Sequence, residues 1–219
     1  MRSQDTLLEA KFNNLCSHYK DTYDLHLSSI KQRDMLFYAL LLISALFSLQ
    51  TVSSDFTNGI ITDFLSKQVG VNIDKKSNLL SSVLWFLLFG ISIKYYQVVI
   101  LIEKQYSYIH GLEEMLNRYY EDTIAFTREG KSYLNGYSML SNWAYISYTL
   151  IFPLLIIYCI WLRITSEIDS AKELYPYVLT DFICYLLIGL SSGLYLMQIH
   201  GALFLPFWLR VKQIYPFRL

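Results

Sequence analysis

The hydrophobic residues of this chain are gathered into long blocks instead of being spread evenly along it. A helix needs about 20 mostly apolar residues to cross a bilayer, because the hydrocarbon core is about 30 Å thick and a helix rises about 1.5 Å per residue. Four blocks meet this requirement: residues 35–52, 79–102, 143–162 and 177–198. Strand-length alternation is absent, and backbone groups in lipid must be paired within the structure itself. The pattern therefore predicts an all-α integral membrane protein with four transmembrane helices.

Two polar segments also carry apolar stripes at helical spacing. The stripe in residues 6–33 consists of Leu8, Phe12, Leu15, Tyr19 and Ile30, and the stripe in residues 103–120 consists of Tyr106, Ile109, Leu112, Leu116 and Tyr119. An amphipathic helix outside the membrane has to bury such a stripe against something. The economical prediction is that the two helices pack on each other as a small antiparallel coiled coil below the membrane. The alternative is a partner protein or neighbouring subunit, for which Tyr106, Ile109, Leu112 and Leu116 are candidate contact residues.

The remaining polar segments have distinct patterns. In the loop 53–78, apolar residues at helical spacing predict a short helix on the membrane surface: Phe56, Ile60, Phe64 and Leu65. In residues 126–143, Gly130 and the pair Asn135–Gly136 predict a compact loop. Its charged residues Arg128, Glu129 and Lys131 are candidate contacts for a partner or a lipid headgroup, or else belong to a solvated turn.

The predicted organisation has five parts. These are an amphipathic helix (1–34), the first two spans with their loop (35–102), a helix and loop (103–142), the last two spans (143–198) and a basic, aromatic tail (199–219). The N-terminal part, the central part and the tail hold twelve Lys and Arg residues, whereas the loops that follow spans one and three hold five. Cytoplasmic loops of membrane proteins are enriched in Lys and Arg. We therefore expect a multi-pass inner-membrane protein with both termini and the central part in the cytoplasm.

Aromatic residues near the ends of the blocks suit the same boundaries. Trp143 opens the third span, Trp161 closes it, and Tyr95 and Tyr96 flank the inner end of the second. Rings of this kind settle at headgroup depth. We therefore expect all four side chains at the membrane–water interface.

Composition and motifs narrow the function. Only 16% of the residues are charged, against about a quarter in soluble domains, and 18 basic residues balance 18 acidic ones. A globally basic surface for nucleic acid is therefore not expected. The three cysteines lie far apart, and the chain has no HExxH, GxSxG or phosphate-binding glycine loop. We expect no enzymatic activity, no metal, no cofactor and no direct nucleic-acid binding.

A few residues inside the spans are candidates for function. Lys94 and Asp181 are the ionisable ones: we expect Lys94 to extend to the inner headgroups and Asp181 to be an exposed, wet carboxylate near the outer surface. Gly189 and Gly193 form a GxxxG spacing, which is a candidate helix-packing seam within the bundle or between protomers. Pro153 is expected to kink the third span or to loosen one of its backbone bonds.

One stretch of the chain resembles a known group of proteins. The runs YIHGLEEMLN and FTREGKSYLNGYSMLSNW, followed by a tyrosine-rich span with FPLL, cover about residues 102–157. This stretch is similar to small bacterial inner-membrane proteins that are found beside antiphage defence genes. Membrane proteins attached to retrons are the nearest comparison, and those of cyclic-oligonucleotide and Kiwa systems are looser ones.

The resemblance implies a membrane-embedded effector. Such a protein stays quiet beside a cytoplasmic sensor protein or ribonucleoprotein, and on infection it permeabilises the inner membrane and causes abortive infection. Homo-oligomerisation in the bilayer is implied as well. Two alternatives remain open: a non-toxic membrane scaffold or sensor subunit that recruits a soluble partner, and a small channel or transporter. The near absence of charged residues at mid-depth disfavours the last.

Overall fold

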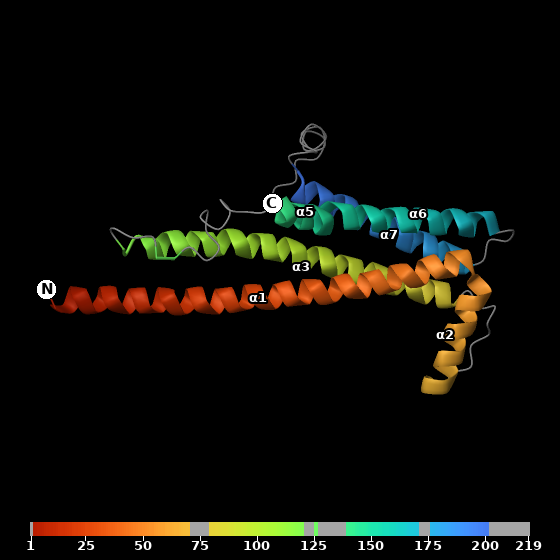
Figure 1. The fold of residues 1–219 in the computed structure, drawn as a ribbon, viewed down its shortest axis with the longest axis horizontal. Helices are drawn as coiled ribbons and strands as arrows, with labels where there is room; N and C mark the ends of the chain where they lie inside the picture. Colours follow the sequence, from red (N-terminus) through yellow and green to blue (C-terminus); the bar gives the residue numbers. More distant parts are fainter. Residues whose placement is uncertain (1, 71–78, 121–124, 127–138, 171–175, 202–219) are drawn as a thin grey trace. The chain divides into compact units, whose positions relative to one another are not determined.

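The computed structural model describes residues 2–70, 79–120, 125–126, 139–170 and 176–201, and every regular element in these ranges is a helix (Figure 1). In chain order the elements are α1 (Arg2–Val52), α2 (Ser54–Val69), α3 (Leu79–Asn117), α5 (Met139–Ile146), a π-helical turn (Ser147–Ile151), α6 (Phe152–Ser170) and α7 (Pro176–Ile199). α1 contains neither glycine nor proline, which explains why it continues unbroken over 51 residues.

Four helical stretches are long and apolar enough to cross a membrane. They are Thr6–Gln50, Ser82–Asn117, Asn142–Thr165 and Leu179–Ile199. Each overlaps one of the apolar blocks that the sequence marks as a span. The prediction of an all-α membrane protein with four transmembrane helices is confirmed.

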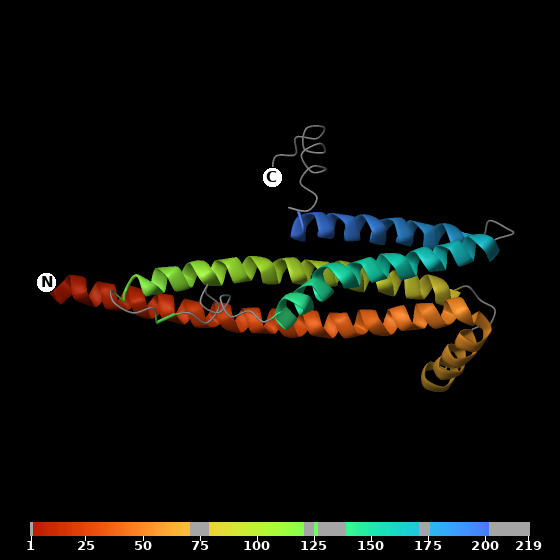
Figure 2. The same ribbon diagram turned by 45° about the horizontal axis from the view of Figure 1, so that its top comes forward.

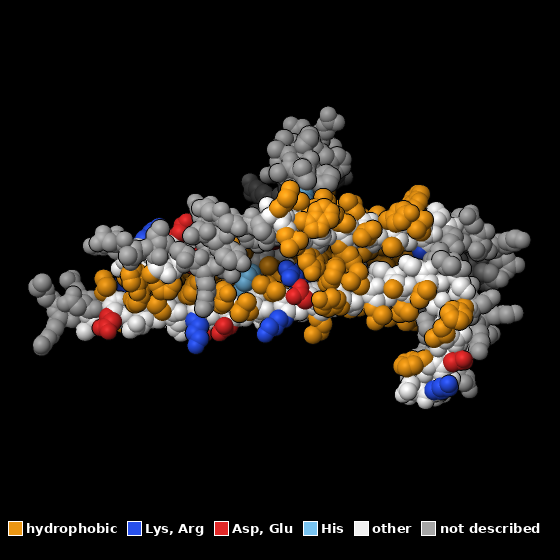
Figure 3. Space-filling view, in the orientation of Figure 1, with side chains coloured by type: hydrophobic (Ala, Val, Ile, Leu, Met, Phe, Trp, Pro, Cys, Tyr) orange, Lys and Arg blue, Asp and Glu red, His pale blue; other side chains and the backbone are white. Residues whose placement is uncertain are grey.

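The chain divides into two compact units that both draw on α1 and α3. Unit 1 consists of Met1–Met35 and Gln97–Tyr145, and unit 2 consists of Leu36–Tyr96 and Ile146–Leu219. Charged side chains line the part of α1 that belongs to unit 1, whereas hydrophobic side chains cover the visible face of α6 in unit 2 (Figure 3). The division therefore follows the change from polar to apolar sequence along both long helices.

Unit 1 is built on two antiparallel helices, residues 2–35 of α1 and residues 97–117 of α3, which lie side by side in both ribbon views (Figures 1 and 2). Its buried core consists of Tyr19, Ile109, Leu112 and Leu116, and the partly buried residues around it are Phe12, Leu15, Cys16, Tyr23 and Phe126. Most of the two apolar stripes therefore pack on each other, as the simpler of the two predictions states, but Leu8 does not take part because it is 59% exposed. The side of the membrane on which this happens stays a prediction.

Two hydrogen bonds of one asparagine side chain hold Phe126 against one end of unit 1. The amide of Asn117, the last residue of α3, donates to the carbonyl of Phe126 and accepts from its N–H, both at 2.8 Å. This places the Phe126 ring against Tyr19 and Tyr120, at 5.8 and 6.0 Å between ring centroids. The chain after α3 thus folds back onto the helix pair and covers the end of its core.

Unit 2 contains the membrane-crossing helices. α6 and α7 form an antiparallel hairpin whose helices lie side by side in both views (Figure 2). Large side chains fill the interior, among them Leu40, Trp85, Ile156 and Ile188, each no more than 1% exposed. The opposite faces of these helices carry exposed leucines and phenylalanines, as surfaces in contact with lipid chains do.

α2 is the short helix that the apolar spacing in residues 53–78 predicts. One residue, Ser53, separates it from the end of α1. It turns away from the axis of α1 and stops at Gly70, whose φ of 70° lies in the left-handed region that favours glycine (Figure 1). Phe56, Ile60 and Phe64 form an exposed apolar stripe along it. The existence of the helix is confirmed, while its position on the membrane surface stays a prediction.

Candidate functional site

The site begins at a defect in the third span. The π-helical turn Ser147–Ile151 directly precedes α6, in which Pro153 is the second residue. In an α-helix the N–H of Phe152 would donate to the carbonyl of Tyr148, but here it donates to the carbonyl of Ser147. The next N–H in this wider register would belong to residue 153, and proline has none. The expected loss of a backbone hydrogen bond near Pro153 is confirmed, and the carbonyl that loses its backbone donor is that of Tyr148.

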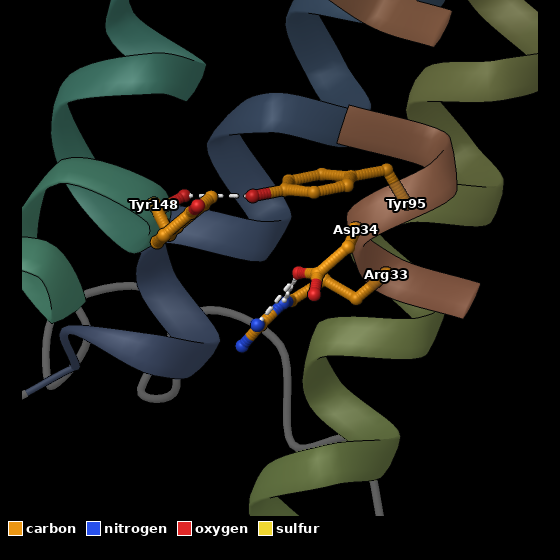
Figure 4. A network of polar contacts seen from close by, with 4 residues as sticks. All are labelled: Arg33, Asp34, Tyr95 and Tyr148. Atoms are coloured by element: carbon orange, nitrogen blue, oxygen red, sulfur yellow. Dashed lines mark hydrogen bonds and ion pairs between the residues drawn. The ribbon is translucent and has the colours of Figure 1, made fainter. Parts of the chain in front are cut away.

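Tyr95 of α3 supplies a hydrogen bond at this defect. Its hydroxyl donates to the carbonyl oxygen of Tyr148 at 3.0 Å, and its side chain is fully buried (Figure 4). A buried carbonyl without a donor costs about 1–3 kcal/mol, so the phenol replaces a bond that the helix itself cannot make. Figure 4 also draws the ion pair between the neighbouring α1 residues Arg33 and Asp34, with 2.7 Å between nitrogen and oxygen.

An aromatic cluster surrounds this hydrogen bond. Phe37 of α1 packs edge-on against Phe152 and Tyr148, with ring centroids 4.5 and 4.8 Å apart, and more loosely against Tyr95 at 6.5 Å. Edge-to-face pairs at these distances add about 0.5–1.5 kcal/mol beyond the area that they bury. The first, second and third spans therefore meet around the π-helical turn.

The prediction that Tyr95 and Tyr96 lie at headgroup depth stays a prediction, but neither ring is on the surface of the bundle. Tyr95 is 0% and Tyr96 4% exposed, inside unit 2. The physical reason is that each hydroxyl has a partner in the interior, so burial leaves no polar group unpaired. Trp143 and Trp161 are exposed instead, as an interfacial position requires.

Tyr96 links the second span to the fourth. Its hydroxyl lies 2.8 Å from the Ser192 hydroxyl of α7, and its ring stacks on Tyr195 at 4.4 Å between centroids. Ser192 is fully buried. In the stretch Gly189–Gly193, the residue that contacts the bundle is thus a serine between the glycines.

Gly189 and Gly193 themselves make no close approach to the rest of the described chain. A Cβ atom at either position would meet nothing within 4 Å. Packing within the bundle is therefore not what these glycines serve. The other alternative, a seam between protomers, stays a prediction.

The two ionisable residues predicted within the spans have opposite environments. Lys94 is exposed on α3, which suits a side chain that extends to the headgroups. Asp181 is only 3% exposed, so the expectation of a wet, exposed carboxylate was wrong. The reason is its helical face: Asp181 lies three and seven residues before Cys184 and Ile188, which are both buried.

Arg163 is one of the five basic residues that the sequence places in the loops after spans one and three, and this also needs correction. α6 continues to Ser170, and Arg163 is 8% exposed on the face that also buries Ile156 and Ile160. Arg163 therefore lies in the helix and not in the loop that follows it, and the orientation of the chain stays a prediction.

Polar contacts cross the helix pair of unit 1. The Tyr19 hydroxyl donates to Oε1 of the buried Glu113 at 2.9 Å, and Nε2 of His18 lies 2.8 Å from the Tyr108 hydroxyl. Polar contacts inside a helix pair fix its register at some cost in stability. These bonds select one antiparallel alignment of α1 against α3.

His26 is buried in the same helix pair. It is 3% exposed, its ring lies 6.3 Å from that of Tyr106, and its Nδ1 has no hydrogen-bond partner among the described residues. Burial lowers the pKa of His26, a hydrogen bond with Gln105 opposes this, and the positive charge of Arg33 lowers the pKa further. The folded pair therefore favours the neutral imidazole.

The partner-contact candidates divide into three groups. Ile109, Leu112 and Leu116 are at most 1% exposed and form the core of unit 1, so they are not available to a partner. Tyr106 is half-buried beside His26. Arg128, Glu129 and Lys131 lie outside the described residues. Exposed apolar residues of unit 1 are found elsewhere, on α1, where Leu8 and Leu25 are each 59% exposed.

No known protein family, curated protein or solved structure matches the chain. Within the described ranges, no group of three His, Cys, Asp or Glu side chains is placed to hold a metal ion. The arrangement offers interior hydrogen bonds between spans. Sequence reasoning missed Tyr95, Tyr96 and Ser192, although Pro153 marks the place where an extra donor is needed.

Proposed function

We propose that the protein is a membrane-embedded effector of a bacterial antiphage defence system, which permeabilises the inner membrane when triggered and causes abortive infection. The observation that carries the proposal is the continuity of α1 and α3, each of which contributes one stretch to unit 1 and another to the spans. A change in the packing of unit 1 therefore reaches two spans through unbroken helix. The resemblance of residues 102–157 to defence-associated membrane proteins supplies the biological setting.

The proposed orientation of the chain determines on which side of the membrane the trigger acts. With the basic residues concentrated in the termini and the central part, both termini and unit 1 lie in the cytoplasm. A sensor protein or ribonucleoprotein there would meet the exposed face of α1, on which Leu8 and Leu25 project. The permeabilising form is a homo-oligomer, because large side chains fill the interior that the described helices of one copy enclose.

Membrane potential and dye entry in living bacteria test the proposal. The gene is induced alone, and then together with its native neighbouring genes during phage infection. We expect depolarisation and entry of a membrane-impermeant dye before phage release, at least in the triggered condition. Unchanged potential in both conditions, with the protein present in the membrane fraction, would contradict it.

A matched variant separates signalling from membrane insertion. Leu25→Glu changes an exposed residue of α1 without touching the core of unit 1. We expect normal insertion but loss of triggered depolarisation if this face receives the sensor. Lys20→Glu, an exposed change on the same helix, is the control for added negative charge.

The second candidate is a non-toxic scaffold or sensor subunit. The same exposed leucines on unit 1 favour it, because they offer a soluble protein a docking face without requiring any change in the spans. Stable co-purification of a soluble partner with no depolarisation in any condition would select this candidate over the first.

A further inference from the structure

One buried face of α3 carries side chains that can hydrogen-bond. Ser82, Trp85, Ser92 and Tyr96 are between 0% and 6% exposed. At 100° per residue these four positions fall within an arc of about 80°, and they extend over about 21 Å of helix. The opposite face is exposed, with Val83 and Leu87, and carries one charged residue, Lys94. Between Ser82 and Tyr96 the helix therefore turns its serine, indole and phenol groups inward over most of the thickness of a bilayer, and only Lys94 projects from the exposed face.

Three of these groups are unpaired inside the bundle. The indole Nε1 of Trp85 and the hydroxyls of Ser82 and Ser92 are buried and have no hydrogen-bond partner among the described residues. Buried polar groups in native proteins are nearly always paired, and each exception calls for an explanation. In a membrane protein the cost is not relieved by water unless water enters.

Two serines elsewhere in the spans do form hydrogen bonds with the backbone of their own helix. Ser48 of α1 donates to the carbonyl of Ser44 at 2.9 Å, and Ser191 of α7 donates to that of Leu187 at 2.7 Å. Both are more exposed than Ser92, and both satisfy their hydroxyl within their own helix. Ser92 and Ser82 do not, so their hydroxyls remain available to a partner in the interior.

We propose that this face of α3, with Ser82, Trp85 and Ser92, lines the water-filled path by which ions cross the membrane in the triggered state. The inference rests on the proposed permeabilising function and names the surface that performs it. In the resting bundle the face is closed, with Tyr96 bonded to Ser192 at its inner end. Separation of α3 from α7 breaks that contact and admits water, which supplies the partners that the resting state lacks.

Cysteine accessibility tests the lining directly. The three native cysteines are first replaced (Cys16→Ser, Cys159→Ala, Cys184→Ala), and triggered depolarisation is measured to show that the cysteine-free protein works. Ser92→Cys is then compared with Val83→Cys, a matched position on the exposed face of the same helix. Intact cells are treated with a charged, membrane-impermeant methanethiosulfonate before and after the trigger. We expect the rate of modification at position 92 to rise by about tenfold or more, with no rise at position 83.

The outcomes separate this inference from the function on which it rests. Depolarisation without faster modification at position 92 overturns the lining and leaves the effector function standing. Absence of depolarisation in the wild-type protein overturns both. Ser92→Ala is a second test that needs no cysteine: it removes an unpaired hydroxyl with little change in side-chain volume, stabilises the resting bundle and should slow depolarisation about fivefold. Depolarisation as fast as in the wild type, with equal protein in the membrane, would exclude the Ser92 hydroxyl from the path.

Discussion

The hydrogen bond from Tyr95 to the Tyr148 carbonyl should contribute measurably to the free energy of unfolding only while residue 153 is proline. Tyr95→Phe removes the hydroxyl and keeps the ring, so the aromatic packing around Phe37 survives. The partly buried carbonyl of Tyr148 would then lie near a proline that offers no N–H. Pro153→Ala returns a backbone N–H to this turn, which reduces the need for the phenol.

The magnitude follows from the burial of the contact. A buried carbonyl left without a donor costs about 1–3 kcal/mol in soluble proteins, and side-chain hydrogen bonds in membranes average about 0.6 with a maximum near 1.7 kcal/mol. Because Tyr95 is 0% exposed and the bond is 3.0 Å long, we expect about 1–1.7 kcal/mol from Tyr95→Phe alone. In the Pro153→Ala background the same change should cost less than about 0.5 kcal/mol, which gives a coupling energy of about 1 kcal/mol.

Reversible unfolding in mixed detergent micelles, followed by tryptophan fluorescence, gives the four free energies of this cycle. Tyr158→Phe is the matched control, because Tyr158 lies on the same helix as Pro153 with 57% of its surface exposed. Its substitution should change the free energy of unfolding by less than about 0.5 kcal/mol. An equal cost of Tyr95→Phe in both backgrounds would refute the reasoning, because the hydroxyl would then not be compensating for proline.

Three further predictions concern other parts of the chain. Because the pKa of His26 is lower in the folded pair than in the unfolded chain, the unfolded chain binds more protons below pH 6.5. Lowering the pH below 6.5 should therefore reduce the free energy of unfolding of unit 1 by up to about 1.4 kcal/mol per pH unit. Thermal unfolding of the His26→Gln variant should not show this dependence on pH. Tyr19→Phe should destabilise unit 1 by about 1.5–3 kcal/mol, because the buried Glu113 carboxylate loses a donor. Protection of the α1 amides against hydrogen exchange measures this change, and unchanged protection would contradict the prediction. Replacing both Gly189 and Gly193 by Leu should leave the fold of one copy intact and abolish depolarisation if these glycines form a seam between protomers, whereas full activity would remove that seam.

The features that depend on one stretch of sequence could be predicted. Twenty apolar residues in a row have few alternatives to a spanning helix, so the four spans follow from their lengths. The pairing of the two polar helices follows similarly, because Tyr19 and Leu112 lie on apolar stripes that must be buried, and each stripe can bury the other. Even here the sequence left open whether a partner would provide that cover.

The features that depend on two distant positions could not be predicted. Tyr95 and Tyr148 are 53 residues apart, and nothing near Tyr95 shows that a carbonyl elsewhere lacks a donor. Asp181 was misjudged for a different reason: its depth in the span was considered, but its face was not. Cys184 and Ile188 continue the same face, and that periodicity was present in the sequence all along.

The π-helical turn has a consequence for how this protein and its relatives change over evolutionary time. A π turn encloses one residue more than an α turn, so the loss of a single residue between 147 and 151 would return the turn to the α register. While residue 153 stays proline, that register would still leave one carbonyl without a backbone donor and would press the proline ring against it. The extra residue, Pro153 and the hydroxyl of Tyr95 should therefore be kept or lost together. Relatives that lack the proline should tolerate a shorter chain at this point and phenylalanine in place of Tyr95, and relatives that keep it should keep all three.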